Sequence, residues 1–118
     1  MIKKDDTAYL TLESMIDMNP SIAIEELSKV VISFERGEKL ASPYKKLSLP
    51  EAHLLLSRAY ARYVSDEFSR GHKKLDELKK ARYHFQEGEN KIKRRSKKLN
   101  RYVSLAYEAI EDVKMEIS

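Results

Sequence analysis

The residues in this sequence that are most able to bind a partner are a run of cations between positions 91 and 101. Seven of these eleven residues are Lys or Arg, and none is acidic. Such a group attracts anions, so it can bind a phosphate backbone or an acidic protein surface. It can also serve only to keep an exposed helix soluble. If the stretch is helical, four cations share one face, and with a fifth they form the candidate binding surface: Lys91, Arg94, Arg95, Lys98 and Arg101.

Other residue types that carry catalysis or hold metals are scattered. The histidines are His53, His72 and His84, and none has a carboxylate at the spacing of a helical metal site. The chain has no cysteine, which excludes disulfides, thiolate chemistry and cysteine-based zinc sites. Its three glycines occur singly, so no glycine-rich phosphate loop is present. We therefore expect a protein that is not an enzyme and binds no cofactor or metal.

The composition is that of one small globular domain with an unusually charged surface. The 118 residues are 42% hydrophobic and 36% charged, with a net charge of +4. Residues 91–118 hold eight Lys or Arg against four Asp or Glu, so this last quarter carries the whole surplus of positive charge. No apolar run is long enough to span a membrane, and no signal peptide is recognisable, so a cytoplasmic protein is expected.

The best-defined helix is predicted over Ser48 to Arg70. Ser48 and Glu51 have the spacing of a capping box, and Pro50 suits a first helical turn. Apolar residues then recur every three or four positions, whereas Arg58 and Arg62 mark an opposite, solvated face. This pattern predicts an amphipathic core helix.

Two further helices are expected before it, which makes residues 1–70 the helical core. The first runs from about Thr7 to Asp17, and Asn19-Pro20 ends it and begins the second. An apolar stripe then leads to Gly37, a plausible helix end, and residues 41–43 form a loop. This stripe consists of Ala23, Ile24, Leu27, Val30, Val31 and Phe34.

Residues 72–118 carry an apolar pattern with a heptad repeat. Alternating steps of three and four residues from Leu75 to Ile117 meet mostly apolar residues, except in the middle of the series. We call this line of residues the seam. The candidate interface residues on it are Phe85, Ile92, Leu99, Val103, Ile110 and Val113.

The seam favours one long or kinked helix over 72–118, although Gly88-Glu89-Asn90 is a natural place for a break. The heptad phase survives the crossing, and a new helix beginning there would place cations at its positive end. One long helix would extend past the rest of the bundle and leave part of the seam uncovered. A second copy of the chain would then cover it, which predicts a homodimer, whereas a break would give a compact five-helix monomer.

We therefore predict an all-α protein, a single domain over 1–118 built as a small antiparallel bundle of four to five helices. Its predicted function is that of a non-enzymatic protein-protein interaction module, a small adaptor or regulator that acts through the seam. The expected partner is another protein, including a second copy of itself, and no membrane. The alternative is a nucleic-acid-binding accessory factor that uses Lys91 to Arg101.

Overall fold

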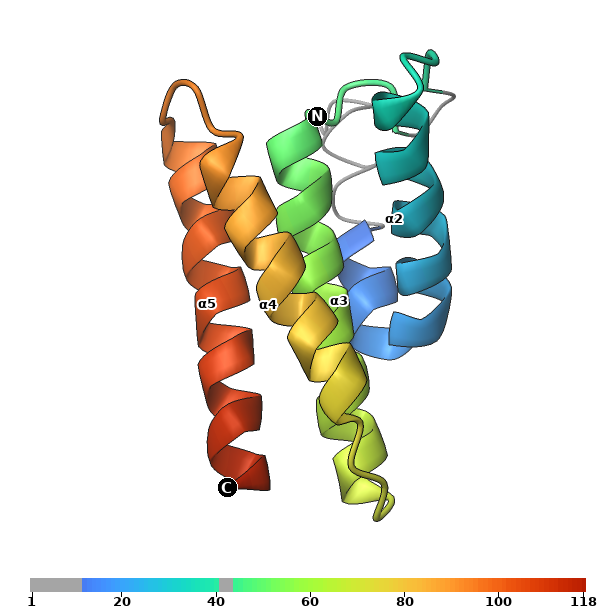
Figure 1. Cartoon of the computed structure of the whole chain (residues 1–118), viewed down its shortest axis with the longest axis vertical. Coiled ribbons are helices and arrows are strands. Elements are labelled where there is room, and N and C mark those ends of the chain that lie inside the picture. The colour runs from blue at the N-terminus through green and yellow to red at the C-terminus, as the bar shows by residue number, and fades with distance from the viewer. Residues whose placement is uncertain (1–11, 41–43) are drawn as a thin grey trace, which may run out of the picture.

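The chain folds into an all-α bundle, described over residues 12–40 and 44–118 of a computed structural model (Figure 1). Residues 12–18 form a helical segment at the start of the described chain. Four longer helices follow: α2 (Pro20–Glu35), α3 (Leu49–Ser69), α4 (Leu75–Asn90) and α5 (Lys97–Ile117). The part of the chain with described structure contains no strand. The predicted all-α class is confirmed.

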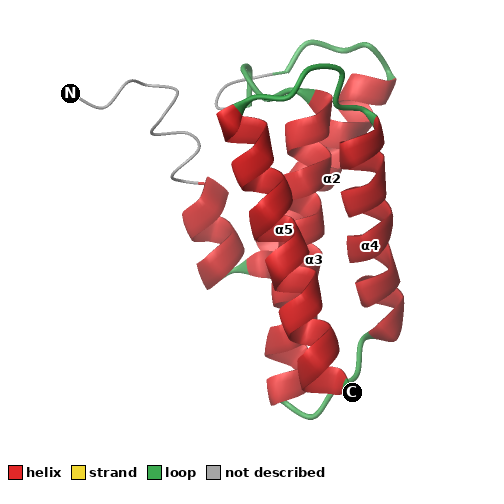
Figure 2. Cartoon of the chain, turned by 90° about the vertical axis from the view of Figure 1, so that its left-hand side faces the viewer, coloured by secondary structure: helices red, strands yellow, loops and turns green. Residues whose placement is uncertain are grey.

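Successive helices run antiparallel, and α3 lies at the centre of the bundle (Figures 1 and 2). The helices α2, α4 and α5 each pack extensively against α3, whereas α4 and α5 touch one another much less. The helical segment 12–18 lies on the side of the bundle opposite α4 (Figure 2). The central helix therefore positions every other element.

The start of α3 follows the capping pattern in the sequence. The Ser48 hydroxyl accepts a hydrogen bond from the Glu51 backbone N–H at 3.3 Å. In return, the Ser48 backbone N–H donates to the Glu51 carboxylate at 3.4 Å. Both bonds satisfy backbone donors that have no partner within the helix. The predicted helix from Ser48 to Arg70 is confirmed as Leu49–Ser69.

The first turns of α3 are not amphipathic. Seven consecutive residues, from Glu51 to Ser57, are buried, so this part of the helix has no solvated face. The burial includes polar groups, which need partners inside the protein. The Ser57 hydroxyl donates to the Ala81 carbonyl of α4 at 2.7 Å, for example. Of the predicted solvated face, Arg62 is exposed, whereas Arg58 is largely covered and pairs with Glu13 and Asp17.

The N-terminal predictions agree with the structure where it is described. Pro20 occupies the first position of α2, and the helical segment 12–18 ends just before Asn19. The Asn19 side chain makes no capping hydrogen bond, although Asn19 is the residue that precedes the helix. Gly37 follows the end of α2 with φ +70°, the left-handed conformation that glycine adopts at low cost. Residues 7–11 and the loop 41–43 of the prediction lie outside the described residues.

The expectation of one long helix over 72–118 is wrong. The helix α4 ends at Asn90, residues 91–96 form a loop, and α5 begins at Lys97. The Ser96 hydroxyl accepts a hydrogen bond from the Leu99 backbone N–H at 3.1 Å and so caps α5. Lys91 directly follows the C-terminal end of α4, where the helix dipole favours positive charge. Lys97 and Lys98, by contrast, lie in the first turn of α5, where the dipole does not favour cations.

The seam is continuous in sequence because α4 and α5 both pack against α3. Each helix of this hairpin needs one apolar stripe, and the six-residue loop happens to preserve the heptad phase. The seam side chains are used within the bundle. Phe85, Ile92, Leu99 and Val103 pack against the main core, and Ile110 and Val113 belong to a second buried cluster near the other end.

Gly88 allows α4 to approach α3 closely. A methyl group at this position would lie 2.9 Å from Leu54 Cγ and 3.2 Å from the Pro50 carbonyl oxygen. The first distance is shorter than a carbon-carbon contact at its optimum of about 3.5–4.0 Å. Glycine therefore stands inside a helix, where it is unfavourable, because the packing of α4 on α3 has no room for a side chain.

We expect Gly88→Ala to destabilise the protein. Alanine is favoured over glycine in a helix by about 1 kcal/mol, but crowding a packed core costs about 1–3 kcal/mol. Urea denaturation of wild type and variant gives the difference in free energy of unfolding. The control is Ser104→Ala on the exposed surface of α5, which we expect to be neutral or slightly stabilising. A Gly88→Ala protein more stable than wild type would contradict the close contact.

Candidate functional site

The predicted basic surface lies on the loop between α4 and α5 and on the first turns of α5. Lys91 directly follows α4, Arg94 and Arg95 belong to the loop, and Lys98 and Arg101 lie on α5. A loop separates them, so they do not form the single helical face that was expected. They remain close in the fold because the loop is only six residues long.

Most of these cations form ion pairs with carboxylates of the same chain. Four of the five predicted residues have such a partner within 3.4 Å, and Arg94 has no ion pair among the described residues. These pairs lower the positive potential available to an external anion. The pairs are Lys91–Glu87 at 3.3 Å, Arg95–Glu89 at 3.4 Å, Lys98–Glu51 at 3.3 Å and Arg101–Glu13 at 3.2 Å.

Two histidines that are 31 positions apart meet between α3 and α4. The Nδ1 atoms of His53 and His84 lie 2.9 Å apart, so one imidazole donates and the other accepts. His53 is only 2% exposed, and its Nε2 has no hydrogen-bond partner. The Tyr60 ring lies parallel to the His84 ring, with centroids 5.8 Å apart.

Burial keeps this histidine pair neutral. Desolvation, with a smaller effect from the neighbouring His53, lowers the pKa of His84 to about 4. Desolvation and the nearby Lys91 also lower the pKa of His53. Two neutral imidazoles could contribute two ligands to a metal ion, but the described residues contain no group of three or more potential ligands. The pair joins α3 to α4 as part of their packing.

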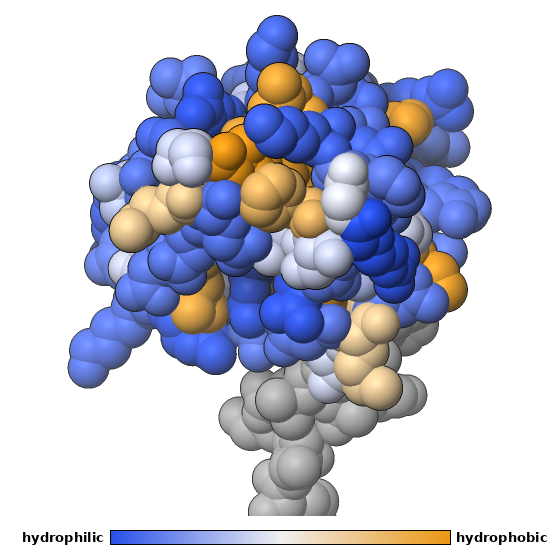
Figure 3. All heavy atoms as spheres, turned by 90° about the horizontal axis from the view of Figure 1, so that it is seen from below, coloured by the Kyte–Doolittle hydropathy of each residue, from blue (hydrophilic) through white to orange (hydrophobic). Residues whose placement is uncertain are grey.

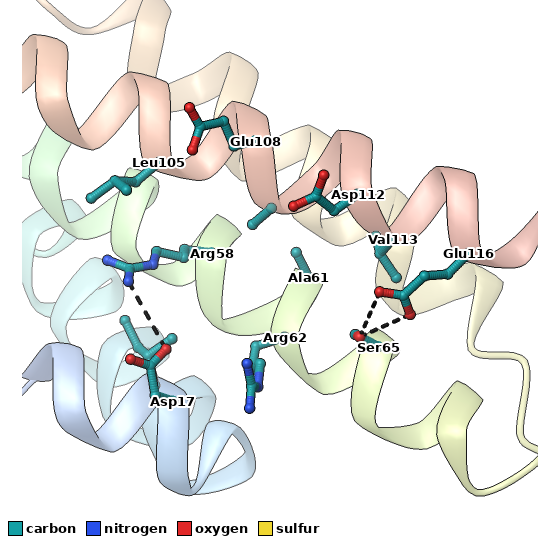
Figure 4. Close-up of a pocket in the computed structure, with 12 residues that line it drawn as sticks. Asp17, Arg58, Ala61, Arg62, Ser65, Leu105, Glu108, Asp112, Val113 and Glu116 are labelled. Atoms are coloured by element: carbon teal, nitrogen blue, oxygen red, sulfur yellow. Dashed lines mark hydrogen bonds and ion pairs between the residues drawn. The ribbon is translucent and has the colours of Figure 1, made fainter.

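A groove runs between α3 and α5, and we call it the α3–α5 groove (Figure 4). Its volume is about 270 Å³. Ile16, Ala61 and Val113 are buried beneath the groove, so its open apolar floor is small and comes from Leu105 and Ala109, and charged side chains stand along its rim. The lining consists of Ile16, Asp17, Arg58, Ala61, Arg62, Ser65, Leu105, Glu108, Ala109, Asp112, Val113 and Glu116.

The groove begins where the chain leaves the surface of α3 and α5. Residues 12–18 lie across these two helices, where Glu13 accepts hydrogen bonds from Arg58 of α3 and Arg101 of α5. Leu12 and Ile16 are fully buried in the core beneath. The chain then turns away at Asn19-Pro20 into α2. Among the described residues, no further helix lies over the groove beyond this turn.

The two walls of the groove differ in their electrostatics. On the α3 wall, Arg58 pairs with Glu13 and Asp17, and Arg62 pairs with Asp66 at 3.3 Å. The α5 wall carries three acidic residues, and of these only Glu116 has a partner, the Ser65 hydroxyl at 2.9 Å. Glu108 and Asp112 are exposed and have no cation partner in the part of the chain that is described. The groove is therefore negative in a chain whose net charge is positive.

Apolar side chains are also exposed at the end of the bundle where α5 finishes (Figure 3). Met18 is 85% exposed, Met115 75% and Leu75 52%. Single exposed apolar residues are normal on a soluble protein surface, and these three belong to different elements. They border the part of the fold that contains the groove but do not line it.

The acidic wall of the α3–α5 groove and the histidine pair were not predicted from the sequence. The acidic wall had a visible signal, since Glu108, Asp112 and Glu116 recur every four residues and so share one face of a helix. The histidine pair left no signal, because its members come together only when α4 folds against α3.

No family model, curated protein or solved structure matches this chain. Among the described helices, none is long and apolar enough to cross a bilayer. The α3–α5 groove and the basic loop between α4 and α5 are the surfaces from which a function can be inferred.

We expect acid to destabilise the protein through the histidine pair. The folded pKa of His84, about 4, lies below its ordinary value of 6.5, so the unfolded chain binds protons more readily. This contribution to stability is present above about pH 6.5 and is lost as the pH falls towards 4. A proton NMR titration of the imidazole gives the pKa directly, with the urea-unfolded protein as control. Titration of His84 near 6.5 in the folded protein would contradict the buried pair.

Proposed function

We propose that this chain is a non-catalytic protein-interaction module that binds its partner in the α3–α5 groove. The observation that supports this proposal is the uncovered groove, where two helices present an apolar floor between charged walls. Side chains of a helical or extended segment of a partner can fill such a surface.

The lining of the groove favours a protein partner over a small substrate. Its volume of about 270 Å³ lies near the lower end of the range of roughly 300–1,000 Å³ that is usual for small-molecule pockets. Among the described lining residues the only hydroxyl is that of Ser65, which donates to Glu116, and no histidine stands beside it. The lining thus offers complementary shape and charge rather than a nucleophile with its base.

The groove replaces the seam as the proposed interaction surface. The seam residues pack inside the bundle, which removes the uncovered apolar surface that favoured a homodimer. Sedimentation velocity at micromolar concentration measures whether a second copy still binds. In this proposal the partner is a different protein, and self-association through the seam is not required.

The proposal predicts that immobilised protein captures at least one partner protein only when the groove is intact. Immobilised wild type is compared with Ala109→Arg, which places a long cation on the floor, and with Asp112→Arg on the exposed rim. Quantitative mass spectrometry of proteins captured from an extract of the source organism should show at least one protein that both variants lose. Two variants are used because Asp112 is exposed, so its replacement should leave the fold intact even if Ala109→Arg disturbs it.

The matched control is Ile32→Arg on α2, which alters a 45% exposed apolar residue outside the groove. Circular dichroism and thermal unfolding establish that each variant is folded. The captured protein should remain bound to Ile32→Arg. An identical set of captured proteins for wild type, control and groove variants would refute the proposal.

A second candidate function is nucleic-acid binding at the loop between α4 and α5. It is supported by three neighbouring cations, Lys93, Arg94 and Lys97, which have no carboxylate partner among the described residues. They are exposed, so they can approach phosphates without breaking an existing ion pair. The five residues predicted from the sequence fit this role less well, because four of them are paired.

Salt dependence tests this second candidate. Three phosphate contacts should give a slope of log K against log salt of about −2 to −3, from about −0.9 per contact on duplex DNA or −0.7 on single strands. Fluorescence anisotropy with labelled DNA and RNA measures it, and Lys93→Glu with Arg94→Glu should abolish binding. The control pair, Lys73→Glu with Lys79→Glu, changes the charge equally at the other end of α4. Absence of binding at low salt would exclude this function.

A further inference from the structure

Building on the proposed function, we propose that the α3–α5 groove binds an amphipathic helix that carries a basic stripe beside its apolar stripe. The helical segment 12–18 provides an example within the fold of what these two helices accept. Its Leu12 and Ile16, four residues apart, insert into the core beneath. Glu13 and Asp17, at the same spacing, meet cations of the surrounding walls. The groove begins where this segment ends.

The shape of the groove favours a second helix in line with the first. Its floor contains Ala61 and Ala109, whose small side chains let another backbone come close, and Val113 lies beside them. Leu105 and Ile16 close the end that is occupied by the segment 12–18. An apolar pair spaced like Leu12 and Ile16 can therefore be accommodated further along the same two helices.

The charge of the groove walls determines the sign of the charge that the partner must carry. Glu108, Asp112 and Glu116 stand on one line along α5, and Figure 4 shows Glu116 reaching Ser65 of α3 while Glu108 and Asp112 lie along the α5 rim. A four-residue step along a helix is about 6 Å, so cations four residues apart on a partner helix match this line. Lysines or arginines at that spacing would compensate Glu108 and Asp112, which have no cation partner among the described residues.

The α3 wall does not oppose this choice of partner. Arg58 contacts Glu13 at 3.4 Å and Asp17 at 3.9 Å, and Arg62 contacts Asp66 at 3.3 Å. Its cations are thus largely neutralised within the fold, whereas the α5 wall is not. An acidic partner helix would face the uncompensated carboxylates and be repelled.

Two synthetic peptides test the inference. Each is an alanine-based helix about 18 residues long, enough to be partly helical alone, with two leucines four residues apart. One carries three lysines at four-residue spacing beside the leucines, and the other carries three glutamates there. Fluorescence anisotropy at low salt should show that the wild-type protein binds the lysine peptide about tenfold more tightly, because favourable contacts replace repulsive ones. Added salt should reduce this difference.

Charge reversal in the groove provides the decisive comparison. In the variant Glu108→Lys with Asp112→Lys, the preference should reverse, so that the glutamate peptide binds more tightly. The control variant, Glu38→Lys with Asp76→Lys, has the same net charge but alters exposed residues that do not line the groove. It should keep the preference for the lysine peptide. NMR shift changes caused by the lysine peptide should map to Ala61, Ala109 and Val113.

The alternatives give distinct results. An unchanged preference in the Glu108→Lys, Asp112→Lys variant, or shift changes outside the groove, would overturn the inference. So would concentration-dependent self-association that Asp112→Lys abolishes, because a second copy would then occupy the groove. If neither peptide binds while capture from the extract still depends on Ala109 and Asp112, the basic helix is refuted and the proposed function stands. If capture does not depend on the groove, the proposed function itself fails.

Discussion

The burial of the first turns of α3 on all sides is the constraint on which the rest of this structure depends. Seven consecutive residues from Glu51 to Ser57 are removed from solvent, so helices must surround the start of α3 completely. That burial includes polar groups, which are costly to bury without partners. The hydroxyl of Ser57 and the imidazole of His53 both find their partners on α4. The packing of α4 on α3 is thus set by hydrogen bonds as well as by apolar contact.

The close approach of α4 connects this constraint to the choice of Gly88. The helices pack so tightly there that a methyl group would overlap the Leu54 side chain. A glycine in the middle of a helix weakens it, and the chain tolerates this because the contact with α3 compensates. The same tight packing brings His84 next to His53 and excludes the water that would solvate a charged imidazole.

The groove arises from the path of the chain on the opposite side of α3. The helical segment 12–18 packs against α3 and α5, and Asn19-Pro20 then redirects the chain into α2. Beyond this turn, the α5 wall of the groove carries three acidic residues. A surface of this kind depends on where the chain turns and on which helices pack together. It carries no sequence motif.

The local features of the fold were determined by the sequence alone. The capping box at Ser48, the proline at the start of α2 and the apolar stripes specify helices through interactions between neighbours in the chain. The tertiary structure decided whether the helix ends at Asn90. One long helix and two helices that both pack against α3 show the same heptad pattern. It also decided the ion pairs of the basic stretch, the histidine pair and the groove. These depend on contacts between residues far apart in sequence, such as Lys98 with Glu51, which local patterns do not encode.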